Sequence, residues 1–151
     1  MSDIVFRAAT AEDIPAIVAM LADDHLGAQR ESPHDLTPYL SAWRQMQAST
    51  DTQQIVGVTE GKVVATMQLT VIPGLSHQGA SRLLIEAVRV DGSRRGGGIG
   101  TRLIEWAIAY GRGHGCSMVE LTTNKSRADA HRFYERLGFE QSHFGYKMRL
   151  D

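Results

Sequence analysis

Gly96, Gly97 and Gly98 have the clearest chemical potential in the chain, because they stand between an aliphatic run and a helical pattern. Glycines leave backbone N–H groups unobstructed, and a helix N-terminus carries partial positive charge, so the segment suits phosphate oxygens. Arg94, Arg95 and Arg102 add positive charge that suits a pyrophosphate and could match a third phosphate. A glycine-rich turn that merely connects a strand to a helix is the alternative interpretation.

Two well-known phosphate loops fit this segment poorly. A P-loop continues Gly-Lys-Ser/Thr, whereas Gly100 is followed by Thr101 and Arg102. A dinucleotide loop requires Gly or Ala where Leu103 stands, and an acidic residue at the tip of the next strand. Glu120 has suitable spacing, but we expect it inside that strand. The sequence therefore favours a phosphate-bearing ligand of another kind.

Glu86 is an isolated carboxylate in the aliphatic run 83–90, which is typical of a buried strand. Burying a carboxylate without a partner costs free energy. Glu86 is therefore predicted either to act as a base or to pair with Arg82 or Arg89. Under the period-two alternation of a strand, it would lie on the same side as Val88.

The cysteine, histidine and charged residues of the chain limit the kinds of site that it can form. The only cysteine, Cys116, excludes an internal disulfide and is interpreted as a small buried apolar residue. The six histidines show no His-Glu-x-x-His spacing, so no metal is expected. Residues 1–81 carry 4 Lys and Arg against 9 Asp and Glu, and residues 82–151 carry 12 against 8. The basic half suits a polyanionic ligand, and Asp23-Asp24 could attract an ammonium group, although solvated surface charge explains both.

The whole chain, residues 1–151, is predicted to form a single α+β domain with helices on both faces of a mixed, mostly antiparallel sheet. Strands are expected over residues 4–9, 55–59, 63–72, 83–90 and 118–123, with a hairpin over 139–150. Helices are expected from near residue 12 to 21, and over 39–47, 99–110 and 127–137. The N-terminus lacks a signal-peptide layout and no apolar run approaches the ~20 residues of a membrane span, so a cytoplasmic location without membrane contact is expected. A pI of about 6.6 argues against nucleic acid.

The run from Val88 to Gly100 resembles the acetyl-coenzyme A signature of the GNAT superfamily of N-acetyltransferases. That signature, Arg/Gln-x-x-Gly-x-Gly/Ala, is matched by Arg95, Gly98 and Gly100. Asn124 and the segment 128–139 resemble the family's asparagine, Phe-Tyr and Gly-Phe region. The motifs from Leu121 to Phe144 are also similar to aminoalkylphosphonate N-acetyltransferases. The acceptor-side segments 22–48 and 72–80 carry no comparable match.

The resemblance implies the GNAT fold with a splayed central parallel strand pair, acetyl-coenzyme A as the acetyl donor, and a homodimer. The implied coenzyme-binding residues are Val88, Arg89, Val90, Arg95, Gly96, Gly97, Gly98, Ile99, Gly100, Thr101, Asn124, His131 and Tyr134. A backbone N–H near Val90 would face the developing oxyanion. Tyr134 aligns with the family's general acid, which protonates the leaving thiolate.

The proton of the amine also needs an acceptor, because an alkylamine with a pKa near ~10 is mostly protonated at neutral pH. Glu86 is the candidate general base, directly or through a water. Alternatives remain open at three positions: Tyr134 could cover core, His131 could be a structural histidine, and Asn124 could cap the next helix. His25, His77 and His143 could line a pocket or lie on the surface.

The expected function is acetyl transfer from acetyl-coenzyme A to the primary amine of a small polar molecule, such as an aminoalkylphosphonate. The amine would attack directly in a ternary complex. A protein lysine or N-terminal acetyltransferase is one alternative, and a non-catalytic acyl-coenzyme A sensor is another.

Overall fold

The computed structural model describes residues 3–151, so Met1 and Ser2 of the N-terminal segment considered above lie outside the described residues. The chain forms two compact units, the first ending at Glu120 and the second running from Leu121 to Asp151. No helix among the described residues is long and apolar enough to cross a membrane.

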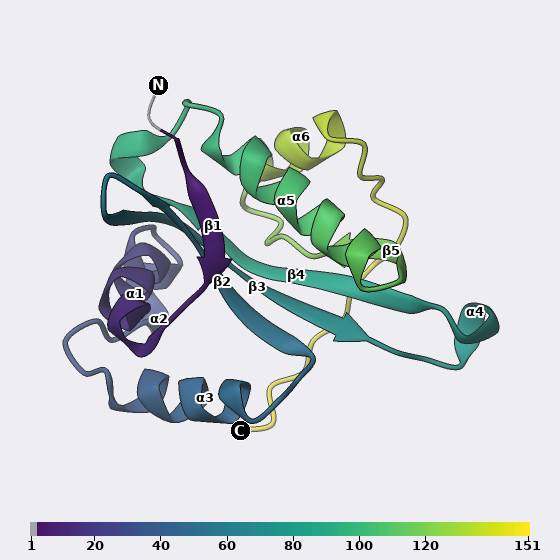
Figure 1. The fold of residues 1–151 in the computed structure, drawn as a ribbon, viewed down its shortest axis with the longest axis horizontal. Helices are drawn as coiled ribbons and strands as arrows, with labels where there is room; N and C mark the ends of the chain where they lie inside the picture. The colour runs from purple at the N-terminus through teal and green to yellow at the C-terminus, as the bar shows by residue number, and fades with distance from the viewer. Residues whose placement is uncertain (1–2) are drawn as a thin grey trace. The chain divides into compact units, whose positions relative to one another are not determined.

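One five-stranded sheet has the strand order β1-β2-β3-β4-β5 (Figure 1). The strands are β1 (Val5–Ala8), β2 (Thr52–Thr59), β3 (Lys62–Ile72), β4 (Ser81–Val90) and β5 (Cys116–Leu121). Pairing is antiparallel from β1 to β4, and β4 and β5 are parallel. The predicted α+β class and the mixed, mostly antiparallel sheet are therefore confirmed.

The helices of the first unit are η1 (Ala11–Asp13), α1 (Ile14–Ala22), α2 (Gly27–Arg30), α3 (Thr37–Gln47), α4 (Ser76–Gly79), η2 (Gly92–Arg94) and α5 (Ile99–Gly113). The helices predicted near 12–21 and over 39–47 and 99–110 are present with longer or shorter ends, whereas α2, α4 and η2 were not predicted. The start of α1 follows a capping arrangement in which the backbone N–H of Thr10 donates to Asp13 Oδ2 at 2.8 Å. Asp13 also accepts from Arg7 Nη1 at 2.7 Å, which ties this helix start to β1.

Helices cover both faces of the sheet in the first unit (Figure 1). α1 packs with Val56 and Val58 of β2, and α3 adds a stripe of half-buried side chains, Tyr39, Leu40 and Trp43. On the opposite face, the fully buried residues Leu103, Ile104 and Ala107 of α5 pack over β3 and β4. Burial of these apolar side chains stabilises both layers and fixes the N-terminus of α5 relative to the end of β4.

β4 contains a β-bulge at Ala87. Thr66 of β3 pairs with Arg89 of β4, and Gln68 of β3 pairs with Glu86 of β4. Between these pairs, two residues of β4 therefore lie opposite one residue of β3. The first of these two, Ala87, has a φ of 51°, which is costly for a residue with a Cβ. The surrounding ladder holds it there, because pairing resumes on both sides of the bulge.

The bulge changes which side chains share a side of the sheet. Glu86 pairs opposite Gln68 and Arg89 opposite Thr66, and these β3 residues lie two apart. Glu86 and Arg89 therefore lie on the same side, which is the side covered by α1. The expectation that Glu86 shares its side with Val88 was wrong, because the extra residue breaks the period-two alternation.

The second unit contains the last residue of β5 and α6 (Ala128–Arg136), which falls within the predicted helix 127–137. The predicted hairpin over 139–150 was wrong, because residues 139–151 have no regular secondary structure. Phe144, Tyr146, Met148 and Leu150 keep the period-two spacing that suggested a strand, but each is at least 82% exposed. The strand was predicted only from the alternation of apolar and polar residues, and in the structure the apolar side chains are not buried.

Candidate functional site

The backbone of the glycine loop has the conformation that only glycine adopts freely. Gly96 and Gly98 have φ values of 84° and 81°, in the left-handed region. Gly98 is the N-cap of α5, and its carbonyl accepts the first helical hydrogen bond from the N–H of Arg102 at 3.1 Å. Gly96, Gly97 and Gly98 are exposed. The loop therefore presents unhindered backbone amides at a helix N-terminus, which is an anion-binding arrangement.

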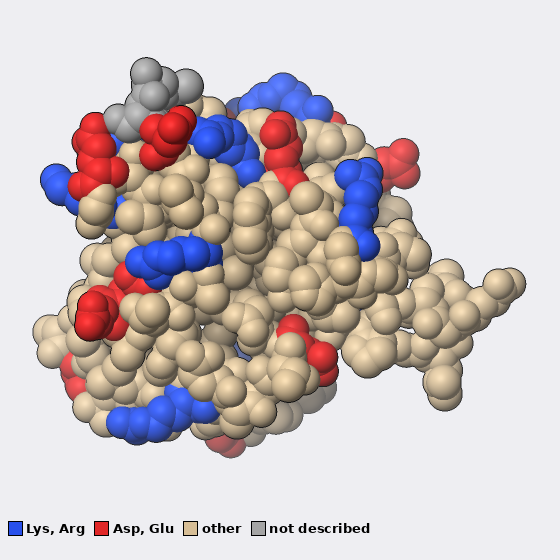
Figure 2. Space-filling view, in the orientation of Figure 1, with Lys and Arg blue, Asp and Glu red and all other residues tan. Residues whose placement is uncertain are grey.

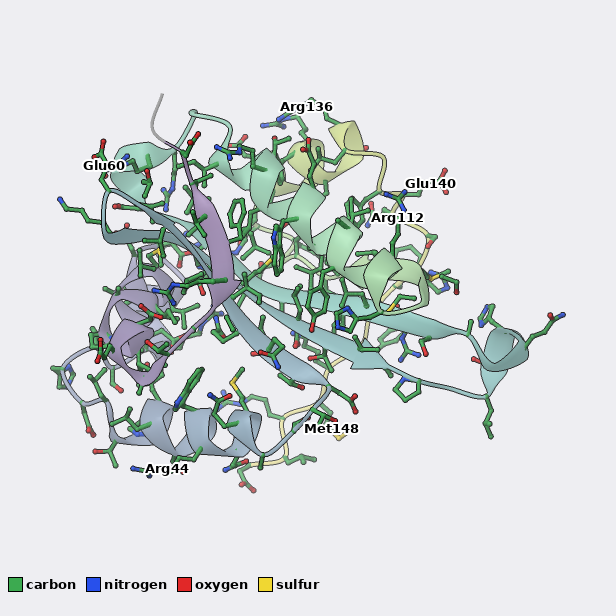
Figure 3. The ribbon with its side chains drawn as sticks, viewed as in Figure 1. Arg44, Glu60, Arg112, Arg136, Glu140 and Met148 are labelled. Atoms are coloured by element: carbon green, nitrogen blue, oxygen red, sulfur yellow. The ribbon has the colours of Figure 1, made fainter. Side chains whose placement is uncertain are left out.

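Three arginine side chains line a cavity of about 400 Å³ beside this loop, together with Ile4 and Thr59 from β1 and β2. Arg94 has an acidic neighbour, since its Nη2 lies 3.9 Å from Glu60 Oε2. Figure 3 labels Glu60 in the turn between β2 and β3. On the face seen in Figure 2, basic and acidic side chains both appear, so the positive charge is local and does not form one broad patch.

The amide of Val90 points away from β3. The N–H of Asp91 donates to the carbonyl of Val64 at 2.8 Å, and Val90 faces Ala65 across the ladder. Consecutive amides of a strand point to opposite edges, so the N–H of Val90 points toward the edge where β5 lies. This is the direction that the predicted oxyanion role requires, and the role itself stays a prediction.

Glu86 is exposed, and its side chain accepts a long hydrogen bond of 3.4 Å from Gln68 Nε2. The expected burial of this carboxylate was wrong. Neither predicted arginine partner pairs with it: Arg82 Nε contacts Glu120 Oε1 at 2.8 Å, and Arg89 Nε lies 3.8 Å from Asp24 Oδ2. Glu86 thus lies on the α1 side of the sheet without either predicted arginine partner, and its role as a general base stays a prediction.

Arg89 is mostly buried, with a side chain that is 13% exposed. Its Nη1 donates to the carbonyl of Val88 at 2.9 Å, and its Nε lies near the carboxylate of Asp24. Asp24 in turn accepts from the N–H of Gly27 at 2.6 Å. The guanidinium thus links β4 to the segment after α1, which is a structural position that sequence reasoning did not anticipate.

A second cavity, of about 540 Å³, lies on the α1 side of the first unit. Ala16, Ala19 and Met20 of α1 line it with Val63, and the carboxylates of Asp23 and Asp91 contribute negative charge. Asp23 was predicted as a residue that could attract an ammonium group. Asp91 was missed, because in the sequence it reads only as the end of a strand and in the structure it also caps η2 through Ser93 N–H at 3.2 Å.

In the second unit, Asn124 and His131 contact each other. Asn124 Oδ1 accepts from the backbone N–H of Ser126 at 2.9 Å, and His131 Nε2 lies 3.1 Å from the carbonyl oxygen of Asn124. The structural interpretation of His131 matches its contact. The capping interpretation of Asn124 was wrong, because the N-cap of α6 is Arg127 without a side-chain cap hydrogen bond, and Asn124 instead closes a local turn with Ser126. Their contacts with a coenzyme stay predictions.

Tyr134 lies on α6 in an aromatic cluster. Its ring contacts Phe133 at 5.1 Å and Phe139 at 5.7 Å between centroids, both edge to face. Such pairs fix the direction of the ring. The half-buried Tyr134 therefore has a defined orientation, which either a core or an acid role requires.

The remaining candidates have simple surroundings. Burial raises the pKa of the Cys116 thiol, which keeps it protonated and fits a non-nucleophilic residue. His77 and His143 are exposed and lie next to Ser76 and Ser142. Among residues 3–151, no group of three or more His, Cys, Asp or Glu side chains could hold a metal ion.

The family model described as "Acetyltransferase (GNAT) family" matches residues 14–139, which cover most of the first unit and part of the second. The chain belongs to the acetyltransferase (GNAT) family. Proteins of this family use acetyl-coenzyme A. The glycine loop has two left-handed glycines before α5, which is an anion-binding arrangement, and its contact with that coenzyme stays a prediction.

Solved structures share the fold over nearly the whole chain. A transcriptional regulator from Bacillus halodurans is 40% identical with a TM-score of 0.93, covering 98% of this chain and 100% of that chain. A putative acetyltransferase from Agrobacterium tumefaciens is 28% identical with a TM-score of 0.85, covering 96% of this chain and 99% of that chain.

Among curated proteins, the aminoalkylphosphonate N-acetyltransferase of Salmonella typhimurium is 48% identical over 56 residues, which are 37% of this chain and 36% of that protein. The glucosamine 6-phosphate N-acetyltransferase of Trypanosoma brucei brucei is 35% identical over 91 residues, 60% of this chain and 58% of that protein. The chain thus spans less than two thirds of these relatives.

Proposed function

We propose that this protein transfers the acetyl group of acetyl-coenzyme A to the primary amine of a small polar molecule, such as an aminoalkylphosphonate. The observation that carries the proposal is the glycine loop, which displays backbone amides at the N-terminus of α5 in a chain of the GNAT family. The partial likeness to the Salmonella aminoalkylphosphonate enzyme supports the choice of acceptor.

The backbone of β4 supplies the proposed hydrogen-bond donor that stabilises negative charge on the thioester oxygen. The N–H of Val90 is directed away from β3, so it can donate to the thioester oxygen as negative charge develops there. The rigid ladder on the β3 side holds this amide in place before the reaction, which is how such a donor contributes to rate.

Proton transfers complete the reaction. The amine must lose a proton before its nitrogen attacks the thioester carbon, and Glu86 accepts that proton, directly or through a water. The C–S bond then breaks, the hydroxyl of Tyr134 donates its proton to the leaving thiolate, and the second proton lost by the acylated nitrogen returns to the tyrosinate, directly or through a water. The acidic cavity lined by Asp23 and Asp91 supports an acceptor that enters as an ammonium ion.

Two alternatives are tested by the same assay. A protein lysine or N-terminal acetyltransferase would use the same donor site with a peptide acceptor. A non-catalytic acyl-coenzyme A sensor is favoured by one observation, the 40% identity to a transcriptional regulator from Bacillus halodurans.

The test is release of free thiol from acetyl-coenzyme A with a panel of aminoalkylphosphonates, amino sugars, aminoglycosides, polyamines, amino acids and lysine peptides. Turnover with a small amine supports the proposal, and turnover with peptides alone would replace it with the protein-acetylating alternative. Tight acetyl-coenzyme A binding without turnover on any acceptor would favour the sensor.

The role of Tyr134 has its own test. Tyr134→Phe should lower kcat by roughly 10²–10⁴-fold while coenzyme affinity stays nearly unchanged. Tyr146→Phe is the matched control, because Tyr146 is 95% exposed in the same unit. Equal kcat values for the two variants would remove the acid role from Tyr134.

A further inference from the structure

The guanidinium of Arg89 reaches the edge of β4 that faces away from β3. Its Nη1 donates to the carbonyl oxygen of Val88 at 2.9 Å. Val88 and Val90 are two residues apart on one strand, so the carbonyl of Val88 and the N–H of Val90 point to the same edge. Arg89 therefore bonds the backbone group next to the amide that the proposed function uses as a hydrogen-bond donor.

We propose that Arg89 is a positioning residue for acetyl transfer, held by Asp24 and acting through the backbone of β4, a role that rests on the proposed function. Its side chain keeps the carbonyl of Val88, and with it the N–H of Val90, in a fixed direction at the edge where the thioester oxygen would lie. A donor that is fixed before the reaction stabilises the developing negative charge without reorganising.

A buried ion pair holds the guanidinium in place. Arg89 Nε lies 3.8 Å from Asp24 Oδ2, and the two side chains are only 13% and 17% exposed. Asp24 Oδ1 also accepts the backbone N–H of Gly27 at 2.6 Å. Removing one member of such a pair leaves a charge away from water, which is costly. The pair therefore restricts Arg89 more than an exposed ion pair would.

The segment after α1 is closely packed, so Asp24 is a firm anchor. A Cβ on Gly27 would lie 1.9 Å from the carbonyl oxygen of Leu21, which shows how tightly the chain turns back against the end of α1. A second contact lies beside the first, because a Cβ on Gly92 would lie 3.2 Å from Asp23 Oδ2. Two consecutive carboxylates after α1 thus meet β4 and the turn that follows it.

The bulge at Ala87 brings Arg89 to this position. Without the extra residue, period-two alternation would place Arg89 on the side of the sheet opposite to Glu86, which is the side covered by α5. With the extra residue, both side chains lie on the α1 side. Ala87 has a φ of 51°, and such strain persists only where the surroundings hold it. The ion pair of Arg89 with Asp24 is one contact outside the ladder that holds the bulge.

Arg7 provides a matched control, because it repeats the same arrangement on β1. Its Nη1 donates to the carbonyl of Ala8 at 3.1 Å and to Asp13 Oδ2 at 2.7 Å. β1 carries none of the groups that the proposed reaction uses. Loss of this second ion pair should therefore report on stability, and loss of the first on stability and positioning together.

The experiment compares Arg89→Met, Arg89→Lys, Asp24→Asn and Arg7→Met in the full chain. Methionine keeps an unbranched stem without the charge, and lysine keeps the charge without the planar fork of donors. Steady-state kinetics on the acceptor found by thiol release gives kcat and KM. Isothermal titration gives the Kd of coenzyme A, and urea unfolding gives the stability of each variant.

Arg89→Met should lower kcat by roughly ten- to a hundred-fold, since the amide loses its fixed direction. The KM of the acceptor and the Kd of coenzyme A should change by less than about three-fold, as expected for an interaction that acts in the transition state. Arg89→Lys should recover part of kcat. Asp24→Asn should also lower kcat, and should cost little more when added to Arg89→Met, because the two side chains act as a unit.

Arg7→Met should lose stability and keep the kcat of the wild type at a temperature where every variant is folded. A kcat of Arg89→Met within about two-fold of the wild type, or an equal loss of kcat in Arg7→Met, overturns the proposal.

Amide hydrogen exchange, measured by NMR, tests the positioning without any substrate. The N–H of Gly27 bonds to the carboxylate of the first ion pair, the N–H of Thr10 to that of the second, and the N–H of Asp91 to β3. Arg89→Met should accelerate exchange at Gly27 and Asp91 but not at Thr10, and Arg7→Met should do the opposite. If the wild type turns over no acceptor, the proposed function fails, and exchange alone decides: unchanged exchange at Gly27 and Asp91 overturns the positioning, and faster exchange supports it.

Discussion

Gly98→Ala should destabilise the protein, whereas the same substitution at Gly113 should stabilise it, although both glycines belong to the ends of α5. Gly98 is the N-cap, with φ 81° and ψ 4°. An added Cβ at either position meets no atom within 4 Å. The difference between the two variants therefore comes from backbone conformation and not from packing.

The magnitudes follow from that difference. A residue with a Cβ in the left-handed region costs roughly 1–2 kcal/mol, and Gly98 must keep that region because its carbonyl starts the helix at Arg102. Gly113 is helical, where replacing Gly by Ala gains up to about 1 kcal/mol. For a chain of this size, 1 kcal/mol changes Tm by roughly 2–4 °C, so the two variants should differ by several degrees.

Urea unfolding and a thermal scan measure the free energy of unfolding of both variants beside the wild type. Titration with coenzyme A completes the assay, because re-aiming the loop amides should weaken coenzyme binding in Gly98→Ala by roughly ten-fold or more. Gly113→Ala should bind as the wild type does. Equal stability of the two variants, or Gly98→Ala as stable as the wild type, would refute the conformational reasoning.

Three further outcomes are expected. Glu86→Gln should lower turnover most at low pH, where the amine is most protonated; a uniform loss from pH 6 to 9 would indicate positioning instead of base catalysis. Hydrogen bonding from Arg7 holds the pKa of Asp13 below its usual range, so its contribution to stability is present above about pH 4 and is lost as the pH falls through the folded-state pKa. In urea unfolding, Asp13→Ala should therefore cost about 0.5–2 kcal/mol at neutral pH, with a gap to the wild type that narrows in acid; a constant gap contradicts the linkage. Gly27→Ala should cost roughly 1–3 kcal/mol, because a Cβ there would overlap the backbone of Leu21; unchanged urea stability would show that the α1–α2 connection yields freely.

The elements of the first unit that the sequence predicted correctly are those whose residue propensities, apolar spacing and turn residues all indicate the same structure. The stripe Leu40, Trp43 and Met46 is half-buried on α3 as its spacing predicts, and the turn Glu60-Gly61 separates β2 from β3. The glycine loop was predictable because few residues other than glycine tolerate positive φ before a helix.

What the sequence did not reveal depends on contacts between distant residues. The pairing of Arg82 with Glu120 joins positions 38 apart, and Thr59 gives no sign in the sequence that it lines a cavity with arginines. The predicted hairpin over residues 139–150 was wrong for another reason. Alternation at Phe144, Tyr146 and Met148 satisfies the strand pattern, but a strand also needs a partner for its backbone, which periodicity does not supply.

The bulge at Ala87 means that β4 contains two phases of alternation. Before it, the even-numbered Leu84 and Glu86 face α1, and after it the odd-numbered Arg89 does. In the sequence, the two phases together produce an apolar run that only Glu86 and Arg89 interrupt. The extra residue leaves the pairs on both sides in register, so a single-codon insertion or deletion can create or remove it without repacking the core. Such a change would move Glu86 relative to Val88 and Val90 while the pairs on both sides of the bulge keep their register.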